Sequence, residues 1–279
     1  MPPKRFEMTI GSNNAQVTAC DALAARTGLS KSKVKQGMIK GAVWHQKPGA
    51  KPRRARRATT VVQSGDRWIF YYDPAILDLL PPQAACFQDY GQFSIWFKPA
   101  GLMVQGTRFG DHCALLRQVE LHFHSKREVY LVHRLDREAS GLVIMAHSRL
   151  AAARFSAMFR RQEIEKRYLI QVHGDLTRQQ TSGRIDLALD GKAALTSFVT
   201  LGYDAAKNQT QVRVRIHTGR YHQIRRHFEM IGFPVMGDPR YGRNNKNSAG
   251  MQLTAYGLSF VCPFGNGRIE ADVDPETRD

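Results

Sequence analysis

Residues 129–146 read VYLVHRLDREASGLVIMA, two apolar stretches that enclose a polar connection. The runs 129–132 and 142–146 predict two buried strands, because short apolar runs of this length suit strands covered on both faces. Polar loops held by a rigid scaffold are common places for functional side chains. Asp136 lies inside this loop, two residues after Arg134. By itself, this pattern also fits an aspartate that caps a turn beside surface arginines.

The order of residues in the loop is more informative than its polarity. His133–Asp136 (HRLD) is followed, after two residues, by Ala139–Leu142 (ASGL). This string resembles the signature of the RluA family of pseudouridine synthases, which usually has Thr at the position of Ala139. Further segments resemble the family's motifs in the family's order: Phe97–Leu102 (Asn is commoner at 97), Lys166–Tyr168, Gly219–His227 (Tyr221 replaces the usual Thr), Gly237–Gly242, and Leu253–Ala255 (Thr254 replaces the usual His).

The resemblance implies an RNA pseudouridine synthase, an enzyme that isomerises specific uridines in structured RNA. The bond between ribose C1′ and uracil N1 breaks, the base turns, and C1′ is rejoined through C5. Because substrate and product are isomers, we expect no cofactor and no metal. In agreement, the sequence has no Walker A motif, no GxGxxG after a predicted strand and no cluster of metal ligands.

The resemblance also implies roles for individual residues. Asp136 is the implied catalytic carboxylate, either as nucleophile or as the base that starts glycal formation, and Arg225 is its implied ionic partner. Tyr168 is implied to hold the uracil. Without the motifs, Arg225 reads as a surface ion pair with Glu229 and Tyr168 as a core residue. The implied substrate-binding residues are His133, Arg134, Leu135 and Leu253, with Arg134 filling the space that the flipped uridine vacates and Leu253 packing on the base.

The alternation of strand-like and helix-like stretches over 89–273 predicts an α+β fold. Residues 212–216 alternate apolar side chains with arginines, which predicts a strand whose basic face either lines an RNA cleft or is simply solvated. The apolar spacing from Ile224 predicts a helix that Gly232 ends. The resemblance narrows the fold to that of pseudouridine synthases, a mixed, mostly antiparallel central sheet flanked by helices.

The chain is strongly basic, with a net charge of +17 and a pI of about 10.1. Residues 1–60 hold 13 Lys/Arg and 2 Asp/Glu, and so carry +11 of that charge. Such a field attracts polyanions, and no amphipathic helix favours a membrane surface, so nucleic acid is the expected partner. No apolar run could span a bilayer, and residues 1–5 do not lead into a signal-peptide apolar region, so we expect a cytoplasmic protein that is not exported. We expect it to act as a monomer.

Residues 15–73 resemble the small S4-like RNA-binding domain. Ser30 is placed to cap a helix whose buried face carries Val34 and Met38, and Gly41 is placed to end it. A basic loop follows, which in most proteins is only a solvated charge run. Beside a basic helix face, it can also form a phosphate-contact surface. The candidate RNA-binding residues are Lys31, Lys33, Lys35, Arg53, Arg54, Arg56 and Arg57.

These features divide the chain into a short series of segments. The predicted boundaries are a tail over 1–14, the S4-like domain over 15–73, a linker over 74–88, the catalytic domain over 89–273 and a tail over 274–279.

Two other classes of function compete with this interpretation. A non-catalytic RNA-binding or ribosome-assembly protein would explain the charge, but not Asp136, Tyr168 and Arg225 together. A nucleoside N-glycosidase normally needs two carboxylates, and Glu138, the nearest acidic residue in sequence, is expected to face away. The S4-like domain favours ribosomal RNA as the substrate, with tRNA as the alternative.

Overall fold

The computed structural model describes residues 2–11, 16–265 and 267–274. The described residues fall into two compact units. The first contains the chain up to Pro81 together with Gln105–Leu121, and the second contains Pro82–Val104 and the chain from His122 onward. The backbone therefore passes between the units three times rather than through a single linker.

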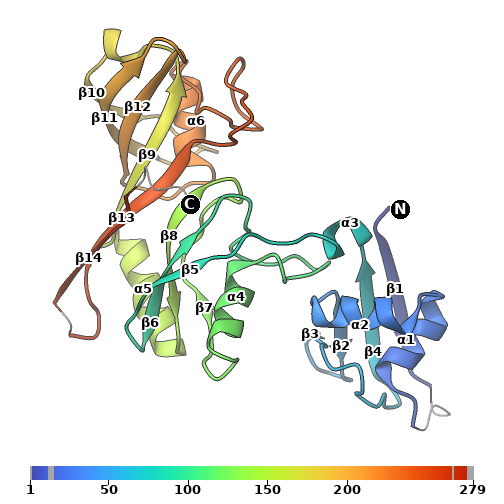
Figure 1. The fold of residues 1–279 in the computed structure, drawn as a ribbon. Helices are drawn as coiled ribbons and strands as arrows, with labels where there is room; N and C mark the ends of the chain where they lie inside the picture. The colour runs from blue at the N-terminus through green and yellow to red at the C-terminus, as the bar shows by residue number, and fades with distance from the viewer. Residues whose placement is uncertain (1, 12–15, 266, 275–279) are drawn as a thin grey trace. The chain divides into compact units, whose positions relative to one another are not determined.

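The first unit is a four-stranded antiparallel sheet covered by helices (Figure 1). Its strand order is β1-β4-β2-β3, and Leu23, Trp68 and Phe70 are completely buried in its core. The elements of this unit are β1 (Lys4–Thr9), α1 (Ala19–Thr27), α2 (Lys31–Ile39), β2 (Val43–Gln46), β3 (Arg53–Arg54), β4 (Arg67–Tyr72) and α3 (Pro74–Leu77).

Helix α2 confirms the prediction made from its capping signals. The Ser30 side chain accepts a hydrogen bond from the backbone N–H of Lys33 (3.4 Å), which satisfies a donor that the first turn leaves open. Val34 and Met38 are fully buried on one face. Gly41 follows the helix with φ +78°, a conformation that glycine adopts without steric penalty.

The structure differs from the predicted boundaries in three places. The expected tail over 1–14 contains β1, whose Glu7 pairs with Arg67 of β4; residues 1 and 12–14 lie outside the described residues. The expected linker over 74–88 contains α3 and most of strand β5 (Ala85–Asp89). Of the predicted C-terminal tail, residues 275–279 also lie outside the described ranges.

The third difference is the segment 105–121, which was expected in the catalytic domain but belongs to the first unit. Asp111 in this segment pairs with Arg56 and with Arg54, whose Nε is 3.0 Å from its Oδ2. The Trp44 indole N–H donates to the carbonyl of Arg108 at 3.0 Å. These partners lie more than fifty residues apart in the sequence, so no local sequence pattern predicts their contacts.

The second unit is built on a ten-stranded mixed sheet, mostly antiparallel (Figure 1). The strand order is β10-β11-β12-β9-β13-β8-β6-β5, with β14 added beside β13 and β7 beside β8. The strands are β5 (Ala85–Asp89), β6 (Phe93–Lys98), β7 (Tyr130–Leu131), β8 (Ser140–Ala146), β9 (Glu165–His173), β10 (Ser182–Asp186), β11 (Leu195–Asp204), β12 (Gln209–Ile216), β13 (Leu253–Val261) and β14 (Arg268–Asp272).

Helices α5 (Arg149–Arg161) and α6 (Gln223–Met230) pack on this sheet, and a 3₁₀ turn (Leu176–Arg178) follows β9. Helix α4 (Leu115–His122) spans the chain boundary between the two units. The α+β fold predicted from the sequence is therefore confirmed. Among the described residues, no helix is both long enough and apolar enough to cross a lipid bilayer.

The predicted strand over 142–146 is part of β8, an interior strand of the sheet that is buried from Gly141 to Ala146. It runs antiparallel to β6 and parallel to β13, where Ser140 pairs with Thr254 and Gly141 with Ala255. Gly141 has φ +123°, and a Cβ built on it would lie 2.2 Å from the carbonyl oxygen of Ala255. The loop that carries Asp136 therefore enters the sheet at a position that admits only glycine.

Replacing Gly141 by alanine is expected to lower the free energy of unfolding by about 3 kcal/mol, because overpacking and a disfavoured backbone conformation act together. Urea unfolding followed by circular dichroism measures this change. Gly202→Ala is the matched control, because a Cβ at Gly202 meets nothing within 4 Å. A Gly141 variant as stable as the control would contradict the close approach of β8 and β13.

Candidate active site

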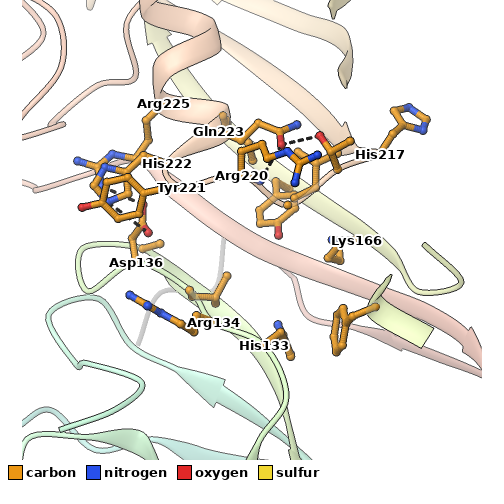
Figure 2. Close-up of a pocket in the computed structure, with 18 of the residues that line it drawn as sticks. His133, Arg134, Asp136, Lys166, His217, Arg220, Tyr221, His222, Gln223 and Arg225 are labelled. Atoms are coloured by element: carbon orange, nitrogen blue, oxygen red, sulfur yellow. Dashed lines mark hydrogen bonds and ion pairs between the residues drawn. The ribbon is translucent and has the colours of Figure 1, made fainter. Parts of the chain in front are cut away.

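The second unit contains an open cleft of about 890 Å³ (Figure 2). Its walls come from four places: the loop before β8, α5 with the start of β9, the segment from the end of β12 into α6, and the start of β13. The cleft brings together all of the predicted catalytic and substrate-binding residues, which are His133, Arg134, Leu135, Asp136, Tyr168, Arg225 and Leu253.

Asp136 and Arg225, 89 positions apart in the sequence, meet in this cleft. Nη1 of Arg225 donates to Oδ2 of Asp136 at 2.9 Å. The Asp136 side chain is 26% exposed, whereas that of Arg225 is 2% exposed. The carboxylate therefore faces the cleft while the guanidinium approaches it from the protein interior.

Arg225 is held in place by a second carboxylate, that of Asp238. Nε and Nη2 of Arg225 donate to the two oxygens of Asp238 at 2.7 and 2.8 Å, a bidentate pair. Burial by itself lowers the pKa of Arg225, but hydrogen bonds to Asp238 and Asp136 outweigh it and raise the pKa. Arg225 is thus not the surface partner of Glu229.

Asp238 was not recognised from the sequence as part of the site, although it stands in the motif Gly237–Gly242. It is fully buried. Burial raises the pKa of its carboxyl, yet the Arg225 hydrogen bonds and the backbone amides of Tyr241 and Arg240 bring the pKa below its usual value. A charged Asp238 can therefore neutralise Arg225 through Nε and Nη2, which leaves Nη1 to bind Asp136.

Lys98 is a further residue that sequence reasoning left without a role. Its fully buried Nζ lies within hydrogen-bond distance of four carbonyls, which its three N–H groups share: those of Ala139 (2.6 Å), Leu102 (2.8 Å), Pro99 (3.0 Å) and Arg137 (3.3 Å). Two of these carbonyls belong to the loop of Asp136. Burial lowers the pKa of Lys98 to about 7, opposed by the charge of Asp136 and of Glu138.

His133 also supports this loop. Its Nε2 accepts a hydrogen bond from the backbone N–H of Ile144 in β8 (2.8 Å), and its ring lies 4.5 Å from that of Phe159. Burial, followed by the charge of Lys166, lowers the pKa of His133 to about 3. The imidazole is therefore neutral and ties the loop to the sheet, in addition to lining the cleft.

Tyr168 and Leu253 are buried neighbours that both line the cleft. Tyr168 lies on β9 and Leu253 begins β13, the adjacent strand. Burial, and after it the charge of Asp136, raises the pKa of Tyr168. The phenol is therefore protonated at neutral pH.

Arg134 and Leu135 line the same cleft with different exposure. Arg134 is exposed, whereas Leu135 is 9% exposed. The basic face predicted on 212–216 is present in β12, where Arg213 and Arg215 are exposed and the intervening valines are buried. Arg215 pairs with Glu165.

His222 and Tyr221 are two cleft residues that the sequence did not identify (Figure 2). Nε2 of His222 is 3.6 Å from Oδ1 of Asp136, and Nδ1 is 3.1 Å from the hydroxyl of Tyr241. His222 has φ +52°, a left-handed conformation that residues other than glycine rarely adopt. Strained backbone conformations of this kind are concentrated at functional sites. The positive φ of His222 is therefore a sign of function that the sequence does not show.

The expectation that Glu138 faces away from the site is wrong. Its Oε2 is 3.8 Å from Nη1 of Arg225, the same nitrogen that binds Asp136. The buried arginine attracts both carboxylates of the loop, a long-range effect that the sequence does not show.

The seven RNA-binding candidates of the first unit have different surroundings. Lys31 pairs with Asp21 at 2.6 Å, and Arg54 and Arg56 hold Asp111. Their charge is therefore partly used within the protein. The candidates that remain exposed without such an ion pair to a described residue are Lys33, Lys35, Arg53 and Arg57.

Residues 2–11, 16–265 and 267–274 contain no group of three or more His, Cys, Asp or Glu side chains arranged to hold a metal ion.

Comparisons with known proteins agree on one family. Residues 92–230 match the RNA pseudouridylate synthase family. The tRNA pseudouridine synthase C of Pasteurella multocida is 33% identical over 65% of this chain and 88% of its own length. The ribosomal large subunit pseudouridine synthase D of Zymomonas mobilis is 29% identical over 63% of this chain and 64% of its own. Human RNA pseudouridylate synthase domain containing 1 has the same fold, with a TM-score of 0.59 at 23% identity, covering 70% of this chain and 86% of that one.

The low pKa of His133 predicts a specific loss of stability in acid. The unfolded histidine titrates near its usual pKa of about 6.5, whereas the folded one does so at about 3. The unfolded state therefore binds the proton first, and stability falls as pH drops below about 6.5. Between pH 7.5 and pH 5 this group should account for about 2 kcal/mol.

Urea unfolding at both pH values measures this effect in the wild type and in His133→Gln, which keeps an acceptor for the Ile144 amide. The wild type should lose about 2 kcal/mol more than the variant. His122→Gln, at an exposed histidine, is the control and should behave as the wild type. Equal losses in His133→Gln and the wild type would show that His133 is not held neutral.

Proposed function

Because this chain belongs to the RNA pseudouridine synthases, we propose that it isomerises uridine to pseudouridine with Asp136 as its catalytic carboxylate. The observation that carries the proposal is the position of Asp136, which faces the cleft while the buried Arg225–Asp238 pair holds it from behind. The family makes the chain an isomerase that acts on RNA. The roles of the residues are our inference from the geometry.

The reaction first breaks the C1′–N1 bond and finally replaces the C5–H bond of uracil by a C5–C1′ bond. C5 loses a proton and N1 gains one, so the product is an isomer of the substrate. Asp136 acts at the sugar, either by attack on C1′ or by removal of a ribose proton toward a glycal. Both routes require an ionised carboxylate. Arg225 favours that form, because a nearby cation stabilises the charged carboxylate.

Tyr168 holds the uracil during this rearrangement. Its ring lies in the cleft, and Leu253 on the adjacent strand lines the same wall. Because its pKa is raised, the hydroxyl serves as a hydrogen-bond donor rather than as a ready base. The detached base can then turn against an apolar surface without leaving the cleft.

Arg134 assists entry of the target nucleotide. Extrusion of a base from its stack costs a few kcal/mol. Arg134 is exposed at the cleft within the loop that carries Asp136, and a guanidinium plane can stack on bases while pairing with phosphates. It can therefore fill the space that the uridine leaves.

We favour ribosomal RNA as the substrate and keep tRNA as the alternative. The relatives carry names of both kinds, a ribosomal large subunit synthase and a tRNA synthase. The first unit is proposed as an S4-like RNA-binding domain, with Lys33, Lys35, Arg53 and Arg57 as its exposed phosphate contacts. We propose a monomeric enzyme, and its RNA substrate supports a cytoplasmic location.

Asp136→Ala and Asp136→Asn are expected to abolish pseudouridine formation and to leave the Kd for RNA within about twofold, because the phosphate contacts lie elsewhere. Carbodiimide-stalled primer extension maps pseudouridine in cells that lack the protein and in cells that carry Asp136→Ala. Asp190→Asn, at an exposed acidic residue paired with Arg226, is the matched control and should restore the wild-type map.

The map also identifies the RNA and its modified uridines. Identical maps in wild-type, deletion and Asp136→Ala cells would overturn the proposed reaction. Release of free uracil from RNA would indicate an N-glycosidase instead.

The role of the basic surface of the first unit in RNA binding can be tested with point variants. Deleting the domain would also remove Arg54 and Arg56, which pair with Asp111. The triple variant Lys33→Ala, Lys35→Ala, Arg53→Ala should weaken RNA binding. It should also reduce the slope of log Kd against log salt concentration by roughly 0.7 to 0.9 for each phosphate that the variant no longer neutralises. Fluorescence anisotropy of labelled RNA at several salt concentrations provides both values.

The matched control removes three exposed positive charges from the second unit, with Lys126→Ala, Arg178→Ala and Lys207→Ala. It lowers the net charge equally but should change the salt slope less. Equal effects of the two triple variants would show that net charge, and not this surface, determines binding.

A further inference from the structure

Tyr221 is an exposed aromatic residue at the edge of the cleft for which the reaction itself has no use. The side chain is 54% exposed and lines the cleft. Large aromatic side chains are usually buried, and in proteins that bind single-stranded nucleic acid the exposed ones serve as surfaces on which bases stack.

The Tyr221 ring is held in a fixed orientation. It stacks on His222 with ring centroids 3.7 Å apart and planes 21° from parallel (Figure 2). Its hydroxyl accepts a hydrogen bond from Nη1 of Arg240 at 3.3 Å. His222 covers one face of the ring, the guanidinium carbon of Arg240 lies 6.0 Å from the ring centroid, and the residue is still 54% exposed.

The stack ends at the catalytic carboxylate. His222 lies between Tyr221 and Asp136, with its Nε2 3.6 Å from Oδ1 of Asp136. A base that stacks on Tyr221 would therefore lie near the reacting centre in space. This position favours a nucleotide that neighbours the target uridine.

The charges around Tyr221 suit a nucleotide bound there. Arg220 precedes it in the chain and Arg240 binds its hydroxyl, and both are exposed. Arg220 is fixed by a hydrogen bond from its Nε to the carbonyl of Ala193 (2.9 Å). Two anchored guanidinium groups beside an aromatic face can neutralise phosphates while the base stacks.

We propose that Tyr221 is a specificity-determining residue, which stacks on the base of a nucleotide neighbouring the target uridine. The inference rests on the proposed function and adds a second nucleotide subsite to it. Stacking tolerates any base, so the subsite selects RNAs in which the neighbouring nucleotide is unpaired and can be splayed out.

The test uses the full-length chain and total RNA labelled with [5-³H]uridine in cells that lack the protein. Formation of pseudouridine releases the C5 tritium to water, so initial rates against RNA concentration give KM and kcat. Tyr221→Thr should raise KM roughly tenfold, the loss expected for one base–aromatic stack, with kcat within about twofold. Tyr221→Phe keeps the ring and should stay near the wild type.

Tyr203→Thr is the matched control, because Tyr203 lies at the end of β11, bonds to Asn208 and does not line the cleft. It should leave both constants unchanged. A second measurement places p-azidophenylalanine at residue 221 and maps photo-crosslinks by primer extension. The crosslink should fall within about two nucleotides of a modified uridine, because stacked neighbours are close along the chain, and the same group at residue 203 should give none there.

The outcomes separate this inference from the function on which it rests. If the wild type releases no tritium, the proposed reaction and the subsite both fail. If the wild type is active and Tyr221→Thr matches it, or if the crosslinks lie far from every modified uridine, only the subsite is overturned. A fall in kcat at unchanged KM would instead show that Tyr221 acts by positioning His222.

Discussion

The buried guanidinium of Arg225 is the group on which the rest of the site depends. It binds Asp238 with two nitrogens and Asp136 with the third, so one charge joins a loop, a helix and the segment after that helix. Removal of one partner from such a buried ion pair typically costs about 3–5 kcal/mol, because the other charge is left without compensation. The position of Asp136 at the cleft thus depends on the fold of the second unit, which brings Arg225 and Asp238 behind it.

The loop of Asp136 is fixed from two further directions. Lys98 donates to carbonyls on both sides of Glu138, and His133 accepts the amide of Ile144 in the central strand. Lys98 is fully buried and His133 is partly buried, and burial lowers the pKa of both side chains. A carboxylate on a loop of this kind has few conformations to lose when substrate binds, which is the advantage of preorganisation.

The sequence predicted the parts of the fold that depend on local patterns. The cap at Ser30, the alternation along β12 and the apolar run of β8 each have a signal within a few residues, and the structure contains all three elements. The segment 105–121 was assigned to the wrong unit, because its Asp111 is held by arginines more than fifty positions earlier. Strand β1 was missed because its sequence is polar and its pairing partner, β4, lies some sixty residues away.

By itself, the sequence determined that this chain is an RNA-modifying isomerase with Asp136, Tyr168 and Arg225 as its candidate catalytic groups. This was possible because each family motif is a short run of consecutive residues and the motifs follow one another in the family's order. The tertiary structure decided how those groups are held. It supplied Asp238 behind Arg225, Lys98 beneath the loop, and His222 beside Asp136, and it turned Glu138 toward the site. The physical reason is that charge pairing and burial depend on distance in space, and residues 89 positions apart become neighbours only when the sheet forms.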